Sequence, residues 1–220
     1  MKRIMSLLIV LFMVVSLALP FSTNNTTKEG KEVLLKPIAL SEITYEIQTV
    51  EVEPIPSPDP YEVAIQNIQA EMDEIESIGD IKEWYIAYRN IVCKYAKWID
   101  PPETVYDYFT EEEVRLICKA VETECYQQDF ESKCNVASTI FNRYESDEFG
   151  ETIEEIITSP NQFAYGRDVI TEDTIWAVMF VWEIEDTTDS ALYFHSNEKT
   201  DTFNGASYLF TDSCGHHFYK

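Results

Sequence analysis

Residues 110–126 read TEEEVRLICKAVETECY, and this stretch decides the fold of the C-terminal half of the chain. Thr110 and Glu113 form a Ser/Thr-x-x-Glu capping box, which marks the start of a helix. Apolar residues then recur at intervals of three and four, the spacing of one helical face. The pattern predicts a helix from Thr110 to about Tyr126 that packs one apolar stripe against a core.

One carboxylate breaks this helical pattern. On a helical wheel Glu124 lies about 20° from Ile117, in the middle of the apolar stripe. Glu122 falls on the polar side, among Arg115 and Lys119, where we expect an ordinary solvated side chain. Glu124 is therefore the residue that calls for an explanation.

A carboxyl group held among apolar side chains is harder to ionise, so its pKa rises. A carboxylic acid that stays protonated near neutral pH can act as a general acid, for example in the cleavage of a glycosidic bond. The other interpretation is a buried structural glutamate, satisfied by Arg143 or by a backbone amide. The periodicity leaves both interpretations open.

Further elements follow from the same kind of pattern. Helical spacing predicts two helices within 61–98, hinged near Gly79, and helices at 132–144, 152–157 and 172–184; in the last, Ile175, Met179 and Trp182 are expected to face inward. Short aromatic segments at 191–194, 207–210 and 217–219, separated by turn residues, predict a small β-sheet. The predicted fold class is α+β, mainly α, with a small C-terminal sheet and a preceding helical segment.

The N-terminus has the pattern of an export signal. Two basic residues precede an apolar run from Ile4 to Leu19, followed by Pro20 and a polar stretch. We therefore expect a signal peptide at 1–21, a flexible Pro-rich linker at 22–60, a helical segment at 61–100 and a catalytic domain at 104–220. The mature protein is predicted to be secreted and extracytoplasmic, with membrane contact only through an N-terminal segment left uncleaved.

Composition excludes several partners. The formal net charge is −24, which argues against binding to nucleic acid, because such binding depends on Lys and Arg. The five cysteines include no C-x-x-C pair, so no zinc signature is present and no metal or other cofactor is expected. In an exported chain they permit one or two disulfides, or buried free thiols. We expect a monomer.

The three histidines, His195, His216 and His217, are the other candidate ligands. Adjacent histidines in a strand point to opposite faces, so at most one of the last two joins His195, which is too few ligands for a typical zinc site. A metal-dependent peptidase, or a thiol-dependent one that pairs a cysteine with His195 or His216, is a further alternative, although no nucleophile motif surrounds any cysteine.

An ordered set of motifs begins at Glu124. It comprises Glu124-Cys125, Glu131-Ser132-Lys133, Val136-Ala137, Asn142-Arg143, Thr152-Ile153, Ile156-Ile157, Pro160-Asn161-Gln162-Phe163, Ala191-Leu192-Tyr193-Phe194 and Gly215-His216-His217-Phe218-Tyr219. This set resembles the SleB-type cell-wall hydrolases of spore-forming bacteria and their phages, over about residues 112 to 220. It departs from the commoner pattern at Cys125, where a small residue usually follows the glutamate.

The resemblance implies a lysozyme-like domain, as in lytic transglycosylases, that cleaves the bond between N-acetylmuramic acid and N-acetylglucosamine in peptidoglycan glycan strands. Glu124 is then the general acid and base. Because aromatic rings stack on sugars and amides bond their hydroxyl groups, Gln162, Phe163, Tyr193 and Tyr219 are candidates to line the substrate groove. A non-catalytic wall-binding protein of the same fold is the alternative from another class.

Overall fold

The computed structural model describes residues 57–146, 148–196 and 205–220. The predicted signal peptide and nearly all of the predicted linker lie outside these residues. No helix in the described ranges is long and apolar enough to cross a membrane.

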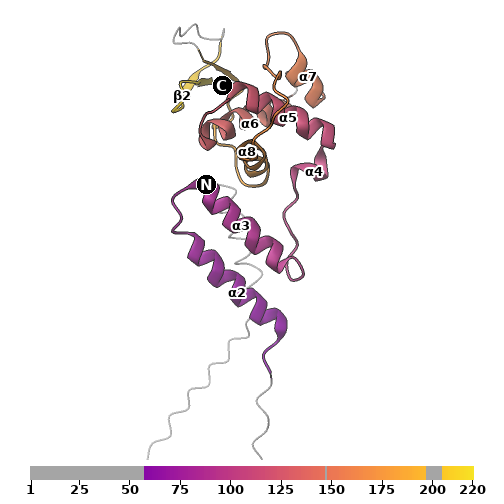
Figure 1. Cartoon of the computed structure of the whole chain (residues 1–220), viewed down its shortest axis with the longest axis vertical. Coiled ribbons are helices and arrows are strands. Elements are labelled where there is room, and N and C mark those ends of the chain that lie inside the picture. Colours follow the sequence, from indigo (N-terminus) through magenta and orange to yellow (C-terminus); the bar gives the residue numbers. More distant parts are fainter. Residues whose placement is uncertain (1–56, 147, 197–204) are drawn as a thin grey trace, which may run out of the picture.

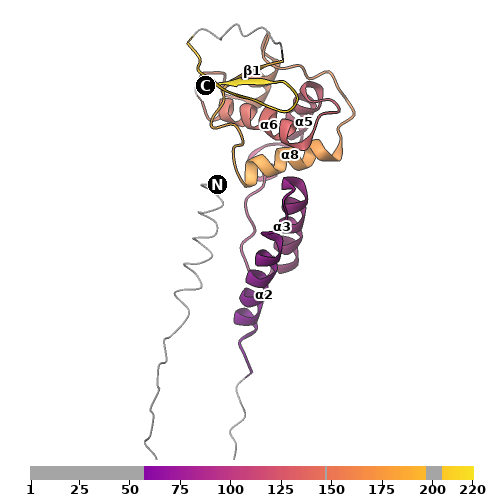
Figure 2. The same cartoon turned by 90° about the vertical axis from the view of Figure 1, so that its left-hand side faces the viewer.

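A helical hairpin comes first. Helix α2 (Pro60–Ile75) and helix α3 (Ile81–Tyr95) lie side by side, as Figures 1 and 2 both show, and Asp80 caps the second helix by accepting from the Glu83 amide. The break between them contains Gly79, so the prediction of two helices hinged there is confirmed.

The hairpin docks on the C-terminal part through α3. The fully buried ring of Tyr85 makes edge contacts with Trp176 and Phe180 of helix α8 (Glu172–Glu183), and its hydroxyl donates to Glu183 Oε2 at 2.7 Å. Arg89 pairs with the same carboxylate at 3.1 Å. The helical segment therefore packs against the C-terminal part through α3.

Helix α5 (Glu111–Glu124) begins where the capping box predicts. Thr110 Oγ1 accepts from the Glu113 amide, and Glu113 Oε2 accepts from the Thr110 amide at 2.9 Å. A short helix that the sequence did not predict, α4 (Val105–Tyr108), precedes it. Val114, Ile117 and Val121 of α5 are buried, which confirms the predicted apolar stripe.

Helix α6 (Phe130–Tyr144) runs through the centre of the C-terminal part. Its side chains are buried from Ser132 to Phe141, because α5, α7 (Ile153–Thr158) and α8 all pack against it. Figures 1 and 2 show this helix above α8 and beside α5. A helix covered on so many sides gives the surrounding elements a fixed platform.

Helix α8 confirms two of the three residues predicted to face inward. Met179 and Trp182 pack against the core, whereas Ile175 is 39% exposed and does not face inward as expected. Thr174, Ala177, Val178 and Val181 are also buried. The reason is that α8 is apolar on several sides and is packed between α6 and α3, so periodicity does not single out one inner face.

The chain ends in a three-stranded antiparallel sheet, as predicted. Strands β1 (Tyr193–His195), β2 (Tyr208–Thr211) and β3 (His217–Tyr219) are ordered β1-β3-β2, so the last strand lies in the middle. The fold is therefore mainly helical with one small C-terminal sheet.

Candidate active site

Glu124 is the last residue of α5, and its side chain is half-buried. The helix ends at Cys125, which leaves helical geometry while its amide still donates to the Val121 carbonyl oxygen. The backbone amide of Ala164 donates to Glu124 Oε1 at 2.6 Å. Of the two structural partners weighed from the sequence, the structure therefore supplies a backbone amide and places Arg143 elsewhere.

The pKa of Glu124 is raised above that of an ordinary glutamate. Burial raises it, and this effect outweighs the Ala164 amide and the charge of His216, which both lower it. A raised pKa keeps the proton on the carboxyl group to a higher pH than in a solvated glutamate. The environment is thus the one that a general acid requires.

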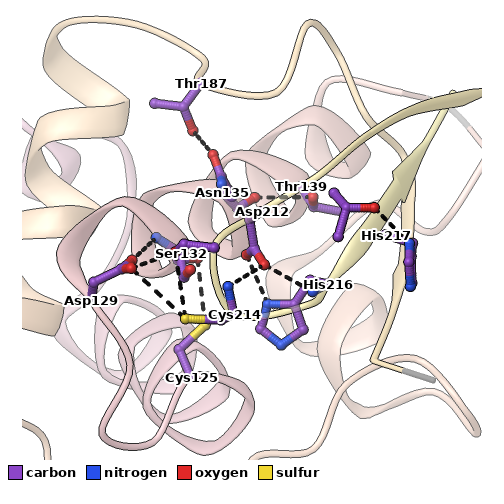
Figure 3. Close-up of polar contacts among 12 residues, drawn as sticks. Cys125, Asp129, Ser132, Asn135, Thr139, Thr187, Asp212, Cys214, His216 and His217 are labelled. Carbon is purple, nitrogen blue, oxygen red and sulfur yellow. Dashed lines mark hydrogen bonds and ion pairs between the residues drawn. The ribbon is translucent and has the colours of Figure 1, made fainter. Parts of the chain in front are cut away.

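His216 is the basic group near Glu124. Its ring is buried, and its Nδ1 lies 3.0 Å from Asp212 Oδ2, while its amide donates to Asp212 Oδ1 at 2.8 Å. Burial raises the pKa of Asp212, but the hydrogen bonds and charge of His216 outweigh this, so the net shift is downward. Figure 3 shows the second ring nitrogen of His216 pointing away from Asp212.

A loop runs along α5 toward Glu124. The Arg167 amide donates to Thr123 Oγ1 at 3.1 Å, and Lys119 Nζ lies 2.8 Å from Asp168 Oδ1. The guanidinium of Arg167 covers the ring of Tyr126. These contacts, with the Ala164 amide, fix the loop beside the glutamate.

Arg143 contacts two of the predicted groove residues. Its Nη1 donates to Gln162 Oε1 at 2.7 Å, and its guanidinium lies 4.7 Å from the centre of the Phe163 ring. Phe163 is 7% exposed, in surroundings typical of a packing residue. Asn142 donates to the Ala191 carbonyl oxygen at 3.1 Å, so this Asn-Arg pair connects α6 to the chain before β1.

The two predicted tyrosines lie opposite each other in the sheet, because Tyr193 of β1 pairs with Tyr219 of β3. The Tyr193 ring is half-buried and meets Phe149 edge-on at 5.5 Å. Tyr219 is 1% exposed, and its hydroxyl lies 2.9 Å from His195 Nε2. Contact with substrate stays a prediction for all four groove candidates.

The prediction that Glu122 is solvated is wrong, since its side chain is 1% exposed. Its Oε2 accepts from the Thr171 amide at 3.0 Å and from the hydroxyl groups of Thr171 and Thr174, and Lys133 Nζ lies 3.7 Å away. Burial raises its pKa, but these hydrogen bonds and the Lys133 charge give a net lowering. The helical wheel missed this because α8 and α6 cover the side of α5 that its own periodicity marks as polar.

The histidines and cysteines do not assemble a metal site in the described parts of the chain, where no group of three His, Cys, Asp or Glu side chains is arranged to hold an ion. His217 is the histidine that approaches His195, with the ring centres 5.2 Å apart. All five cysteines are free thiols; Cys118, Cys125 and Cys134 are buried.

The C-terminal part of the chain matches a known protein family. The model of the family described as Cell Wall Hydrolase matches residues 127–220. The match supports a SleB-like cell wall hydrolase family for this part of the chain. The comparison with curated proteins gives no match.

Two solved structures are similar to this chain. The crystal structure of the catalytic domain of the Bacillus cereus SleB protein has 24% identity and a TM-score of 0.46, over 51% of this chain and 92% of that one. The catalytic domain of the germination-specific lytic transglycosylase SleB from Bacillus anthracis has 21% identity and a TM-score of 0.47, over 52% and 98%.

The hydrolase-family match begins at residue 127, three residues after Glu124. Glu124 thus lies outside the matched residues, whereas Ala164 and His216 lie within them. The matched region and the end of α5 meet at this carboxyl group through the Ala164 hydrogen bond.

Proposed function

We propose that this protein cleaves the glycan strands of peptidoglycan, at the bond between N-acetylmuramic acid and N-acetylglucosamine, with Glu124 as general acid and base. The observation that carries the proposal is the half-buried carboxyl group of Glu124, with its raised pKa, held by a backbone amide of the cell wall hydrolase domain.

The first step is proton transfer to the glycosidic oxygen. The Ala164 amide binds Oε1 of Glu124, which directs the protonated form to carry its proton on Oε2. As the bond between the anomeric carbon and the glycosidic oxygen breaks, that oxygen takes the proton and leaves as a hydroxyl group. Positive charge develops on the sugar ring, and Glu124 becomes a carboxylate.

The second step returns a proton to Glu124. The carboxylate removes the proton of the sugar's own 6-hydroxyl, whose oxygen then bonds to the anomeric carbon and closes a 1,6-anhydro ring. If water takes the place of that hydroxyl group, the same residue produces a reducing end by hydrolysis. Neither route requires a second carboxylate acting as a nucleophile.

Two exposed tyrosines flank the glutamate and were not singled out from the sequence. Tyr126 lies two residues after it and is 45% exposed, with the Arg167 guanidinium over one face of its ring; Tyr165 follows Ala164 and is 38% exposed. Exposed rings can stack on the apolar face of a sugar, whereas the buried rings of Phe163 and Tyr219 cannot do so without rearrangement. We therefore place the glycan strand along the Tyr126 and Tyr165 side of Glu124.

Export to the cell wall belongs to the same proposal. Peptidoglycan lies outside the cytoplasmic membrane, and the apolar run after Lys2 and Arg3 supplies the signal that such a route requires.

The test is substitution of Glu124 by Gln, which preserves shape and removes the acid. We expect E124Q to release soluble fragments from purified peptidoglycan at least about 100-fold more slowly than the wild-type chain, the usual contribution of a general acid. E112Q is the matched control, because Glu112 lies on the same helix with an exposed side chain, and it should keep wild-type activity.

Mass spectrometry of the released fragments reports the outcome of the second step, because an anhydro end is lighter than a reducing end by one water. Retained activity in E124Q would refute the proposed role of Glu124. Binding to peptidoglycan without any fragment release by the wild-type chain would indicate a wall-binding protein. Inhibition by a chelator or a thiol blocker would indicate a peptidase.

A further inference from the structure

Two cysteines that are far apart in the sequence meet beside the proposed acid. Cys125 directly follows Glu124 at the end of α5, and Cys214 lies in the turn between β2 and β3, two residues before His216. Figure 3 shows their sulfur atoms next to each other, between the N-terminus of α6 and this turn.

Both sulfurs contact the first turn of α6. Cys125 Sγ donates to the Ser132 carbonyl oxygen at 3.4 Å, and Cys214 Sγ lies 3.8 Å from Asp129 Oδ2. Asp129 caps that turn, since its Oδ1 accepts from the Ser132 amide at 2.8 Å. The two thiols also interact electrostatically, and this interaction contributes to the raised pKa of Cys125. Separate contacts to one helical turn therefore hold the two sulfurs beside each other.

The turn that carries Cys214 is itself well anchored. Ser213 Oγ donates to Asp129 Oδ2, and Asp212 Oδ1 accepts from the Cys214 amide at 3.0 Å. Gly215 completes the turn with a φ of 88°, in the left-handed region that favours glycine. Cys214 is thus held over α6 from both sides of the turn.

We propose that Cys125 and Cys214 form a disulfide bond when the folded protein meets a thiol-oxidising partner, namely a disulfide-bearing molecule. The bond would covalently join the end of α5 to the turn between β2 and β3. Within the described parts of the chain, no other two cysteines both contact the same helical turn in this way.

The exchange reaction balances in two steps. Cys214 is partly exposed, so its thiolate can attack the disulfide of the oxidant, which releases one thiol and leaves a mixed disulfide on Cys214. The buried Cys125 thiol then gives up its proton as its sulfur attacks the Cys214 sulfur, and the departing thiolate of the oxidant takes up that proton and leaves as the second thiol. The protein loses two hydrogen atoms and two thiols of the oxidant are formed.

The link would have a consequence for the site, which rests on the proposed function. It joins the residue after Glu124 to the turn that carries Asp212 and His216, the pair that sets the charge near the acid. It also closes a loop of about 90 residues, so it should restrict the unfolded chain strongly.

Peptide mapping tests the bond directly and needs no activity. The full chain is purified with reductant, transferred to oxidised glutathione, blocked with iodoacetamide and digested without reduction. We expect one linked pair of peptides containing Cys125 and Cys214, lighter than their sum by two hydrogen atoms and separated by reduction. The link should persist in C93S, because Cys93 is exposed on α3, and disappear in C214S.

Thermal unfolding supplies a second measurement. Oxidation should raise Tm of the wild-type chain and of C93S by roughly 10 °C, as expected for a loop of this length, and should leave Tm of C214S unchanged. A linked pair between Cys125 and Cys134, a persistent mixed disulfide on Cys214, or no linked peptide in the oxidised wild-type chain would each overturn the proposal. None of these outcomes changes the test of Glu124.

Discussion

Substitution of Glu122 by Ala tests the correction that the structure made to the helical wheel. The carboxylate accepts three hydrogen bonds from Thr171 and Thr174 on one oxygen, and Lys133 lies 3.7 Å from it. Removing one partner of a buried ion pair costs about 3–5 kcal/mol, because the other charge is left buried without compensation. We therefore expect E122A to lose about 3–5 kcal/mol of the free energy of unfolding.

Urea denaturation followed by tryptophan fluorescence measures this loss, because Trp176 and Trp182 lie on α8, whose N-terminal end donates hydrogen bonds to Glu122. E112A is the matched control on the exposed side of α5 and should change the free energy of unfolding by less than about 0.5 kcal/mol. Adding K133M to E122A removes the uncompensated charge and should restore part of the stability.

The pH dependence of the free energy of unfolding provides a second check on the role of Glu122. The pKa of Glu122 is lowered in the folded protein, so its contribution to stability is present above the ordinary pKa of 4.5 and is lost as the pH falls through the lowered value. The stability difference between wild type and E122Q should therefore shrink in acid. A loss below about 1 kcal/mol in E122A at neutral pH, or no rescue by K133M, would refute the reasoning.

Two further predictions concern the acid and the hairpin. His216→Gln removes the charge that lowers the pKa of Glu124, so that pKa rises further and the alkaline limb of the pH–activity profile moves to higher pH; an unmoved limb would contradict the assignment. Tyr85→Ala empties a fully buried site against α8 and should cost about 3–5 kcal/mol, with faster proteolysis of α3. Tyr106→Ala, at a half-exposed ring, is the control.

Local sequence was sufficient for the elements that depend on neighbouring residues. The capping box at Thr110 and Glu113 places the start of α5, and the apolar spacing after it identifies the buried stripe. The same spacing singled out Glu124 as a carboxylate on an apolar face, and its pKa is indeed raised by burial. The helix start and the apolar stripe follow from contacts within one or two helical turns, which a sequence states directly.

Tertiary structure alone decided which groups surround the carboxylates. Glu122 lies on the polar side of its own helix, yet it is buried because Thr171 and Thr174, about fifty residues later, cover it. Similarly, the loop at Ala164 and the turn at His216 reach Glu124 from distant parts of the chain. Helical periodicity indicates which side of one helix faces a core. The burial and the pKa of a side chain depend on every segment that packs against that helix. Long-range packing determines which segments these are.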